Sequence, residues 1–88
     1  MTTTFTDHGW SDYIYWQDYD PETLQRINDL IKDIKRDPFK GLGKPEPLRG
    51  NLAGYWSRRI TDEHRLVYRA VLLFICEIFK WFILCRSN

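Results

Sequence analysis

The sequence has few of the residues that mark a secreted or metal-binding protein. It contains two cysteines, Cys76 and Cys85, among 88 residues, too few for the disulfide framework of a small secreted domain. No cysteine or histidine pair has the spacing of a metal site, so we expect no metal ion and no organic cofactor. The first residues show no basic stretch followed by an apolar one. We therefore expect no secretion signal and a cytoplasmic location.

Long apolar runs are also missing. Residues 70–85 are strongly apolar, but the run is only sixteen residues long, and Glu77 and Lys80 interrupt it. A membrane helix needs about 20 uninterrupted apolar residues. We interpret the run as buried strand and expect no membrane partner.

Aromatic and charged residues are plentiful, at 16% and 28% of the chain, and 43% of the residues are hydrophobic. This composition is typical of a folded protein, and the length suits a single domain over residues 1–88. The net charge is only +1, but its distribution is uneven. Residues 1–34 hold seven acidic and two basic residues, a net charge of −5, and residues 35–88 hold eleven basic and five acidic ones, a net charge of +6. The C-terminal half is therefore basic.

Two acidic helices are predicted as a hairpin over about residues 7–36. Thr6 or Asp7 is the expected N-cap of the first helix, whose apolar positions follow a helical period only roughly. The second helix has Asp20 as a good N-cap and Pro38 as its stop. The apolar residues expected in the core are Trp10 and Trp16 of the first helix and Leu24, Ile27, Leu30, Ile31 and Ile34 of the second.

A loop over residues 37–54 is predicted next, because residues 39–50 hold three glycines and two prolines. Residues 55–86 have the composition of a sheet. The expected strands are residues 55–61, 65–71 and 80–86, with a short edge strand at 2–6. Strands after a helical hairpin predict an α+β fold, with two N-terminal helices packed on a twisted antiparallel sheet of about four strands.

Cations and aromatic rings are mixed in the basic half. This combination is typical of proteins that bind single-stranded nucleic acid, because arginines hold phosphates and rings stack on bases. A solvated basic face that balances the acidic helices is the alternative. The residues concerned are Lys44, Arg49, Arg58, Arg59, Arg65 and Arg69, with Tyr55, Trp56 and Tyr68.

Glu46 is the lone carboxylate between residues 39 and 61, and a proline on each side stiffens its backbone. Metal-independent RNA cleavage needs a base for the 2′-hydroxyl proton, a cation for the phosphate charge and an acid for the leaving oxygen. Glu46 has the chemistry of the base, and Arg65 or Arg59 that of the cation. A simple ion pair between a loop carboxylate and an arginine is the alternative.

Residues 43–68 read GKPEPLRGNLAGYWSRRITDEHRLVY, and this run resembles the signature block of the YoeB/Txe family, the RelE-like toxins of bacterial toxin–antitoxin systems. The resemblance covers about residues 5–70. It implies a RelE-like, microbial-RNase-like toxin that enters the ribosomal A site and cleaves mRNA by 2′-hydroxyl attack. The N-terminal residues that resemble the same family are Trp10, Asp12, Tyr13, Tyr15, Trp16, Ile27, Asn28 and residues 30–33.

The resemblance also implies roles for single residues. Glu46 matches the general base of the family, and Arg65 matches the residue that stabilises the phosphate charge. Arg49 and Arg59 match basic positions that hold the RNA backbone, and Lys44 lies in the same loop motif. The implied partners are the ribosome, mRNA and a YefM-like antitoxin that covers the basic face, with operator DNA reached only through the antitoxin.

The C-terminal residues depart from the family pattern. The family ends its last strand in Cys-Arg-Tyr-His-Tyr, and the resemblance makes that histidine the expected general acid. Here Asn88 lies where the histidine would be, and an amide is no useful proton donor near neutral pH. The two histidines of the chain, His8 and His64, are expected to be solvated turn or capping residues.

This departure gives two further expectations. We expect low or no toxicity with antitoxin binding retained, so the alternative function is a catalytically weakened or inactive family member that binds antitoxin and acts as a co-repressor. A plain RNA-binding module is a third hypothesis. Residues 71–84, apolar and without a turn residue, are expected at a sheet edge and predict a tendency to form a homodimer or aggregate.

Overall fold

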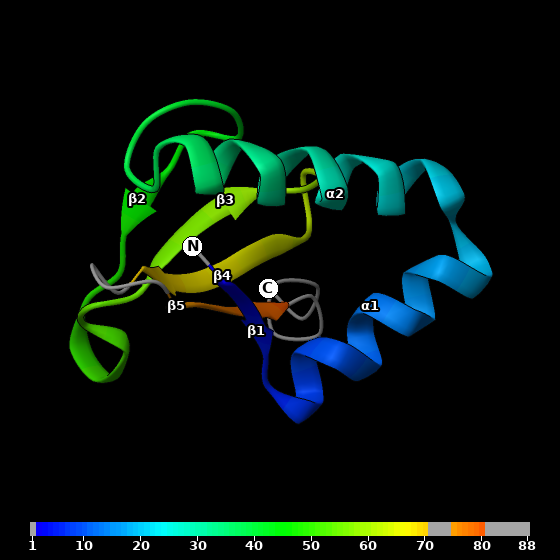
Figure 1. The fold of residues 1–88 in the computed structure, drawn as a ribbon, viewed down its shortest axis with the longest axis horizontal. Coiled ribbons are helices and arrows are strands. Elements are labelled where there is room, and N and C mark those ends of the chain that lie inside the picture. Colours follow the sequence, from blue (N-terminus) through cyan, green and yellow to red (C-terminus); the bar gives the residue numbers. More distant parts are fainter. Residues whose placement is uncertain (1, 71–74, 81–88) are drawn as a thin grey trace.

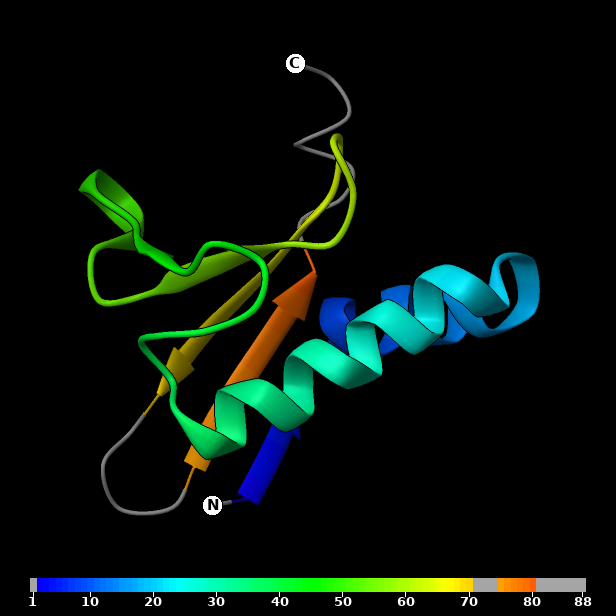
Figure 2. The ribbon, with the colours of Figure 1, turned by 90° about the horizontal axis from the view of Figure 1, so that it is seen from above.

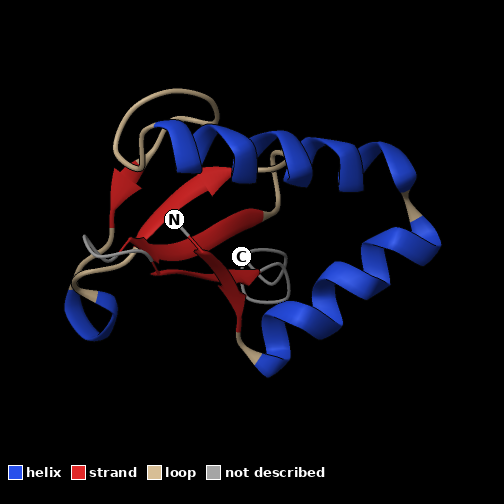
Figure 3. Ribbon diagram, in the orientation of Figure 1, coloured by secondary structure: helices blue, strands red, loops and turns tan. Residues whose placement is uncertain are grey.

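The computed structural model describes residues 2–70 and 75–80. Five strands form one sheet in the order β1-β5-β4-β3-β2. The two helices are joined at one end and diverge from there like a V, with the sheet at the open end of the V (Figures 1 and 3). The elements are β1 (Thr2–Phe5), α1 (Asp7–Tyr19), α2 (Pro21–Arg36), β2 (Glu46–Pro47), the 3₁₀ helix η1 (Gly50–Leu52), β3 (Trp56–Arg59), β4 (Arg65–Ala70) and β5 (Ile75–Lys80).

Capping side chains fix where the two helices begin. The Thr6 hydroxyl accepts a hydrogen bond from the Gly9 amide at 3.0 Å, so Thr6, and not Asp7, is the N-cap of α1. The Asp20 carboxylate accepts bonds from the hydroxyl and amide of Thr23 at 2.7 and 3.2 Å, and the Thr23 hydroxyl lowers the pKa of Asp20 below its ordinary value. The prediction of Asp20 as the second N-cap is confirmed, and α2 ends before Pro38, as predicted.

The core lies between α2 and the sheet. Its fully buried members from the predicted apolar stripe of α2 are Ile27, Leu30 and Ile34, whereas Leu24 and Ile31 are only partly buried. Opposite them lie Ile60, Leu66 and Tyr68. Burial of such side chains is the main stabilising contribution to a domain of this size.

The expectation that Trp10 belongs to the core is wrong. Its side chain is 52% exposed and lies at the start of α1, where it stacks on Tyr13 and meets Phe5 edge-on. Trp16 is partly buried and packs against the core, as expected. The weak helical periodicity of α1 accounts for the difference, because a helix without a clear apolar stripe leaves some large side chains at the surface.

The α+β prediction is confirmed: two helices pack on a sheet whose strands β2 to β5 are antiparallel, and β2 is a fifth strand beside the four that were expected. β2, β3, β4 and β5 pair antiparallel in that order. β1, predicted as an edge strand, lies at the edge and runs parallel to β5. The predicted loop 37–54 contains the two-residue strand β2 and the η1 turn.

The last strand differs from its prediction. β5 occupies Ile75–Lys80 and lies between β1 and β4, so the described part of residues 71–84 is not at a sheet edge. The sequence placed this strand at residues 80–86, of which 81–86 lie outside the described residues. Without a glycine, proline, asparagine or aspartate in the preceding run, the sequence carried no signal for the turn. Within the described ranges, no helix has the length and apolar character needed to cross a bilayer.

Candidate functional site

The strand register brings the predicted site residues to the side of the sheet that faces away from α2. Glu46 of β2 lies opposite Ser57 of β3, and Arg59 of β3 lies opposite Arg65 of β4. Partners directly across two strands share a face, and so do alternate residues along one strand. Glu46, Ser57, Arg59 and Arg65 therefore lie on one face.

Glu46 of β2 and Arg65 of β4 form an ion pair across β3, the strand that lies between them. Arg65 Nη1 donates to Glu46 Oε1 at 2.7 Å, and the same nitrogen lies 3.4 Å from the Ser57 hydroxyl. The two charged side chains are 56% and 33% exposed. Such an exposed pair contributes about 0–1 kcal/mol to stability. The carboxylate is thus accessible to a ligand and is oriented mainly by the strands that carry it.

Arg59 and Arg65 share the site because the connection between β3 and β4 has an odd length. Residues 60–64 form this loop, and the amides of Ile60 and Thr61 donate to the His64 carbonyl at 2.9 and 3.2 Å. A two-residue turn would have placed Arg65 opposite Ile60 and on the other face from Arg59. The loop as formed places Arg59 directly opposite Arg65, on the face of the sheet that carries Glu46.

His64 is buried, so the expectation of a solvated histidine is wrong for it, whereas His8 is exposed. The His64 ring packs edge-on against Trp16 of α1 with centroids 5.1 Å apart. The Thr61 hydroxyl, 3.0 Å from its Nδ1, accepts bonds from the backbone amides of Glu63 and His64. The histidine therefore belongs to the contact between the loop and α1.

Lys44 and Arg49 lie on either side of Glu46, and both are exposed. Lys44 has a backbone φ of +53°, a left-handed conformation that costs a non-glycine residue about 1 kcal/mol. Gly43, the residue before Lys44, accepts a hydrogen bond from the Arg59 amide at 2.7 Å through its carbonyl. This bond brings the backbone at Lys44 close to Arg59. Arg49 is the N-cap residue of η1, and η1 lies in the connection between β2 and β3 (Figure 2).

A further cation follows Arg65 on the same face of β4. The Arg69 guanidinium lies over the ring of Tyr55, 5.5 Å from its centroid, and alternation along the strand puts Arg69 on the side of Arg65. Ring and cation together extend the basic surface toward η1. A role of these two residues in binding nucleic acid stays a prediction.

Three other residues of that mixture face the opposite way. Trp56, Arg58 and Tyr68 lie on the helix-facing side of β3 and β4, where Trp56 packs against the core and the other two are fully buried. Their assignment to a nucleic-acid surface is wrong. The sequence contained a signal for this, because successive residues of a strand face opposite sides and Arg58 must therefore face away from Ser57 and Arg59. It was missed because an arginine is rarely buried in a core.

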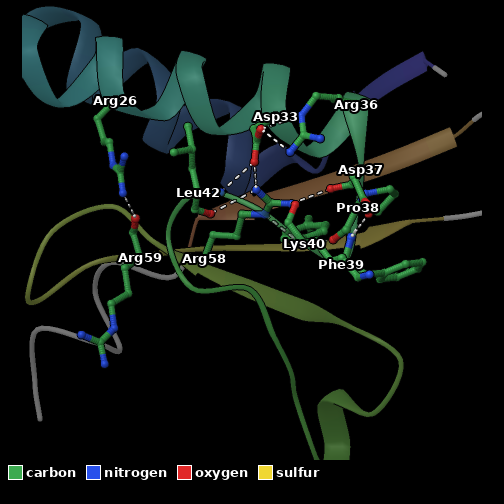
Figure 4. Close-up of polar contacts among 11 residues, drawn as sticks. Arg26, Asp33, Arg36, Asp37, Pro38, Phe39, Lys40, Leu42, Arg58 and Arg59 are labelled. Atoms are coloured by element: carbon green, nitrogen blue, oxygen red, sulfur yellow. Dashed lines mark hydrogen bonds and ion pairs between the residues drawn. The ribbon is translucent and has the colours of Figure 1, made fainter.

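Buried Arg58 ties the loop after α2 to the sheet. Its side chain is 0% exposed, and each of its five N–H groups has an acceptor (Figure 4). The acceptors are Asp33 Oδ2 at 2.5 Å, the carbonyls of Asp37, Lys40 and Leu42 at 2.7, 3.1 and 3.0 Å, and the Tyr68 hydroxyl at 3.1 Å. The Tyr68 hydroxyl in turn donates to the Pro38 carbonyl at 2.5 Å.

Asp33 is the anionic member of this network. It accepts bonds from the Leu42 amide at 2.8 Å and from Arg58 and Arg36. The Leu42 amide and then Arg58 lower the pKa of Asp33 to about 2. Within the described residues, no group of histidine, cysteine, aspartate and glutamate side chains is arranged to hold a metal ion.

Comparison with known proteins decides the family. A family described as the YoeB-like toxin of bacterial type II toxin–antitoxin systems matches residues 5–76. Toxin YoeB of Streptomyces coelicolor is 65% identical over 69 residues, which cover 78% of this chain and 82% of that one. The chain belongs to the YoeB-like toxins.

Solved YoeB structures have the same fold. The YoeB/ParE toxin of Agrobacterium tumefaciens is 52% identical in sequence and superimposes with a TM-score of 0.86. The match covers 90% of this chain and 93% of the Agrobacterium chain. Two structures of Staphylococcus aureus YoeB, each 42% identical and covering 90% of this chain and 91% of the other, have TM-scores of 0.84 and 0.83. The first is described as a YoeB dimer and the second as a heterotetrameric YoeB–YefM toxin–antitoxin complex.

Proposed function

We propose that this YoeB-like toxin is a ribosome-dependent endoribonuclease that cleaves mRNA in the ribosomal A site. The observation that carries the proposal is the ion pair between Glu46 and Arg65 at 2.7 Å, with Arg59 directly opposite Arg65. A base and two cations thus meet on a face that carries further basic residues. These are the groups that RNA cleavage without a metal requires.

In the proposed reaction Glu46 accepts the proton of the ribose 2′-hydroxyl. The 2′-oxygen then bonds to phosphorus, the bond from phosphorus to the 5′-oxygen breaks, and a 2′,3′-cyclic phosphate forms. Negative charge grows on the phosphate oxygens during this step. Arg65 stabilises that charge, because its contact with Glu46 uses Nη1 and a guanidinium has further N–H donors for a phosphate.

Lys44, Arg49 and Arg59 hold the RNA backbone in this proposal. All three are exposed: Lys44 and Arg49 flank β2 in the sequence, and Arg59 lies opposite Arg65. Cations that neutralise phosphates make binding fall with rising salt concentration. Their contribution is therefore expected in affinity and its salt dependence, whereas that of Glu46 and Arg65 is expected in the chemical step.

The leaving 5′-oxygen also needs a proton. Asn88, which lies where the family carries its histidine, and the preceding Ser87 are both outside the described residues. Neither side chain is an effective acid near neutral pH. This feature of the sequence favours the second candidate function, a weakened or inactive toxin that binds a YefM-like antitoxin and acts with it as a co-repressor.

A cleavage assay on ribosomes separates the two candidates. The chain is added to ribosomes stalled on a defined mRNA and to the same mRNA alone, and cuts are mapped by primer extension. The enzyme proposal expects a cut in the A-site codon only with ribosomes, and its loss in Glu46→Gln. Tight binding of a YefM-type antitoxin without any ribosomal cut would select the second candidate.

A further inference from the structure

We infer that Arg58 is a positioning residue for this reaction, which holds residues 37–43 against α2 and β4 and thereby places Glu46 beside Arg65. The inference rests on the proposed function, because Arg58 is buried and would affect catalysis only through the position of Glu46, without contacting the RNA. Arg58 lies on the helix-facing side of β3, and Glu46 lies on the other side.

Arg58 organises residues 37–43, a loop without regular secondary structure of its own. Backbone carbonyls in such a segment need partners when they are buried. Arg58 binds three of them, at residues 37, 40 and 42. A buried guanidinium is tolerated only when it is fully paired, and all five of its donors are used here. The loop and the arginine therefore depend on each other.

The loop also fits closely around Asp33. The Leu42 amide bonds to Asp33 Oδ2, the oxygen that also accepts from Arg58. A Cβ on Gly41, whose φ is +126°, would lie 2.0 Å from the same oxygen. The loop backbone can approach the carboxylate only because residue 41 has no side chain.

Gly43 connects the Arg58 network to the candidate site. At Gly43, a Cβ would lie 2.9 Å from Leu30 Cδ2 and 3.1 Å from Arg58 Cβ, and the Gly43 carbonyl accepts the Arg59 amide at 2.7 Å. Lys44 follows in a left-handed conformation, and the ring of Pro45 fixes its own φ. The direction in which the chain enters β2, and hence the position of Glu46, is set at this contact.

The Glu46–Arg65 ion pair is too exposed to hold the loop by itself, as its small expected contribution to stability shows. β2 is only two residues long and has few ladder hydrogen bonds to resist a shift. A displacement of about 1 Å of a reacting group can lower a rate about 10²-fold. Loosening the Arg58 network is therefore expected to slow the chemistry even when the protein stays folded.

Tyr68→Phe is the informative variant, because it removes one hydroxyl that accepts from Arg58 Nε and donates to the Pro38 carbonyl. Tyr13→Phe is the matched control: it also removes a tyrosine hydroxyl, one that donates to Asn28 between α1 and α2 at 2.7 Å. We expect Tyr68→Phe to slow single-turnover cleavage on ribosomes by about 10- to 100-fold, with ribosome affinity unchanged. Tyr13→Phe should cleave at the parent rate.

A double-mutant cycle tests whether the effect passes through Glu46. In a Glu46→Gln background, Tyr68→Phe should cause no further loss of the residual rate, since residues that act as a unit are strongly non-additive. An equal loss in both backgrounds, or no loss in either, overturns the positioning role. So does an equal loss from Tyr13→Phe, because that would reflect general destabilisation.

Amide hydrogen exchange distinguishes failure of this inference from failure of the proposed function. In Tyr68→Phe the amides of Leu42 and Arg59 should exchange faster than in the parent, and in Tyr13→Phe they should not. Unchanged exchange in Tyr68→Phe contradicts the anchoring of the loop by Arg58. If the parent chain cleaves nothing, the proposed function fails and the positioning role fails with it, whereas the exchange result still decides the anchoring.

Discussion

Arg59 and Arg65 lie directly opposite each other on β3 and β4, on the same face as Glu46. Two like charges in this relationship destabilise a sheet. Within residues 2–70 and 75–80, the ion pair that Glu46 makes on this face is with Arg65, at 2.7 Å. The proposed function gives this arrangement a role, because two neighbouring cations suit the binding of a phosphate.

Replacing Arg59 should separate a role in phosphate binding from a role in the stability of the fold. Arg59→Ala removes the like-charge contact, so the free energy of unfolding should stay the same or rise by up to about 0.5 kcal/mol, as measured by urea denaturation. RNA or ribosome binding should weaken. A clear loss of stability without any loss of binding would mean that Arg59 serves the fold.

Arg65 and Arg49 should differ in the step that they affect. Arg65 contacts Glu46, so Arg65→Ala should lower the cleavage rate of the bound complex more than its affinity. Arg49 is the N-cap residue of η1, so Arg49→Ala should mainly weaken binding and flatten its dependence on salt. Single-turnover rates and affinities over a range of salt concentrations check this. Identical kinetic profiles for the two variants would contradict the division of roles.

Asp33 gives the stability of the protein a defined dependence on pH. The Leu42 amide and Arg58 hold its pKa at about 2, below the ordinary value of 3.8. A lowered pKa in the folded state contributes stability above the unfolded pKa, and this contribution is lost as the pH falls toward 2. Asp33→Asn should be less stable than the parent at pH 7, and the difference should shrink between about pH 4 and 2. Denaturation at several pH values measures it, and a constant difference would contradict it.

The C-terminal residues give a prediction about the general acid. Replacing Ser87-Asn88 by Tyr-His-Tyr should raise ribosomal cleavage by about 10²–10⁴-fold, the scale expected for a restored acid. Tyr-Gln-Tyr at the same place is the control and should leave the rate near that of the parent. Growth arrest by the unaltered chain at the strength of its relatives would contradict the loss of the acid and point to another proton donor.

The sequence predicted the elements with local signals and missed those that depend on tertiary structure. Caps and prolines marked the helices, strand composition marked β3, and the alternation of residues between the two faces marked β4. The position of β5 had no turn signal, and its interior place in the sheet follows from pairing with β1, which is distant in the sequence. Long-range pairing of this kind leaves no mark in a local pattern.

The same distinction holds for the site. Glu46 stood out as a lone carboxylate between prolines, and the structure does bring it to Arg65. That Arg59 joins them depended on the length of the 60–64 loop, which composition did not define. Arg58 resembled its neighbour Arg59 in the sequence, and only the packing of residues 37–43 against β3 distinguishes a buried anchor from a surface cation.

The most direct test of the account is the cleavage rate of Glu46→Gln on ribosomes, measured in a single turnover beside Glu63→Gln. Glu63 is an exposed glutamate of the 60–64 loop, so its variant controls for the loss of one negative charge. The account predicts that Glu46→Gln loses at least about 10²-fold in rate while its denaturation midpoint stays near that of the parent, and that Glu63→Gln cleaves normally. Equal rates for the parent and Glu46→Gln would contradict the assignment of Glu46 as the base.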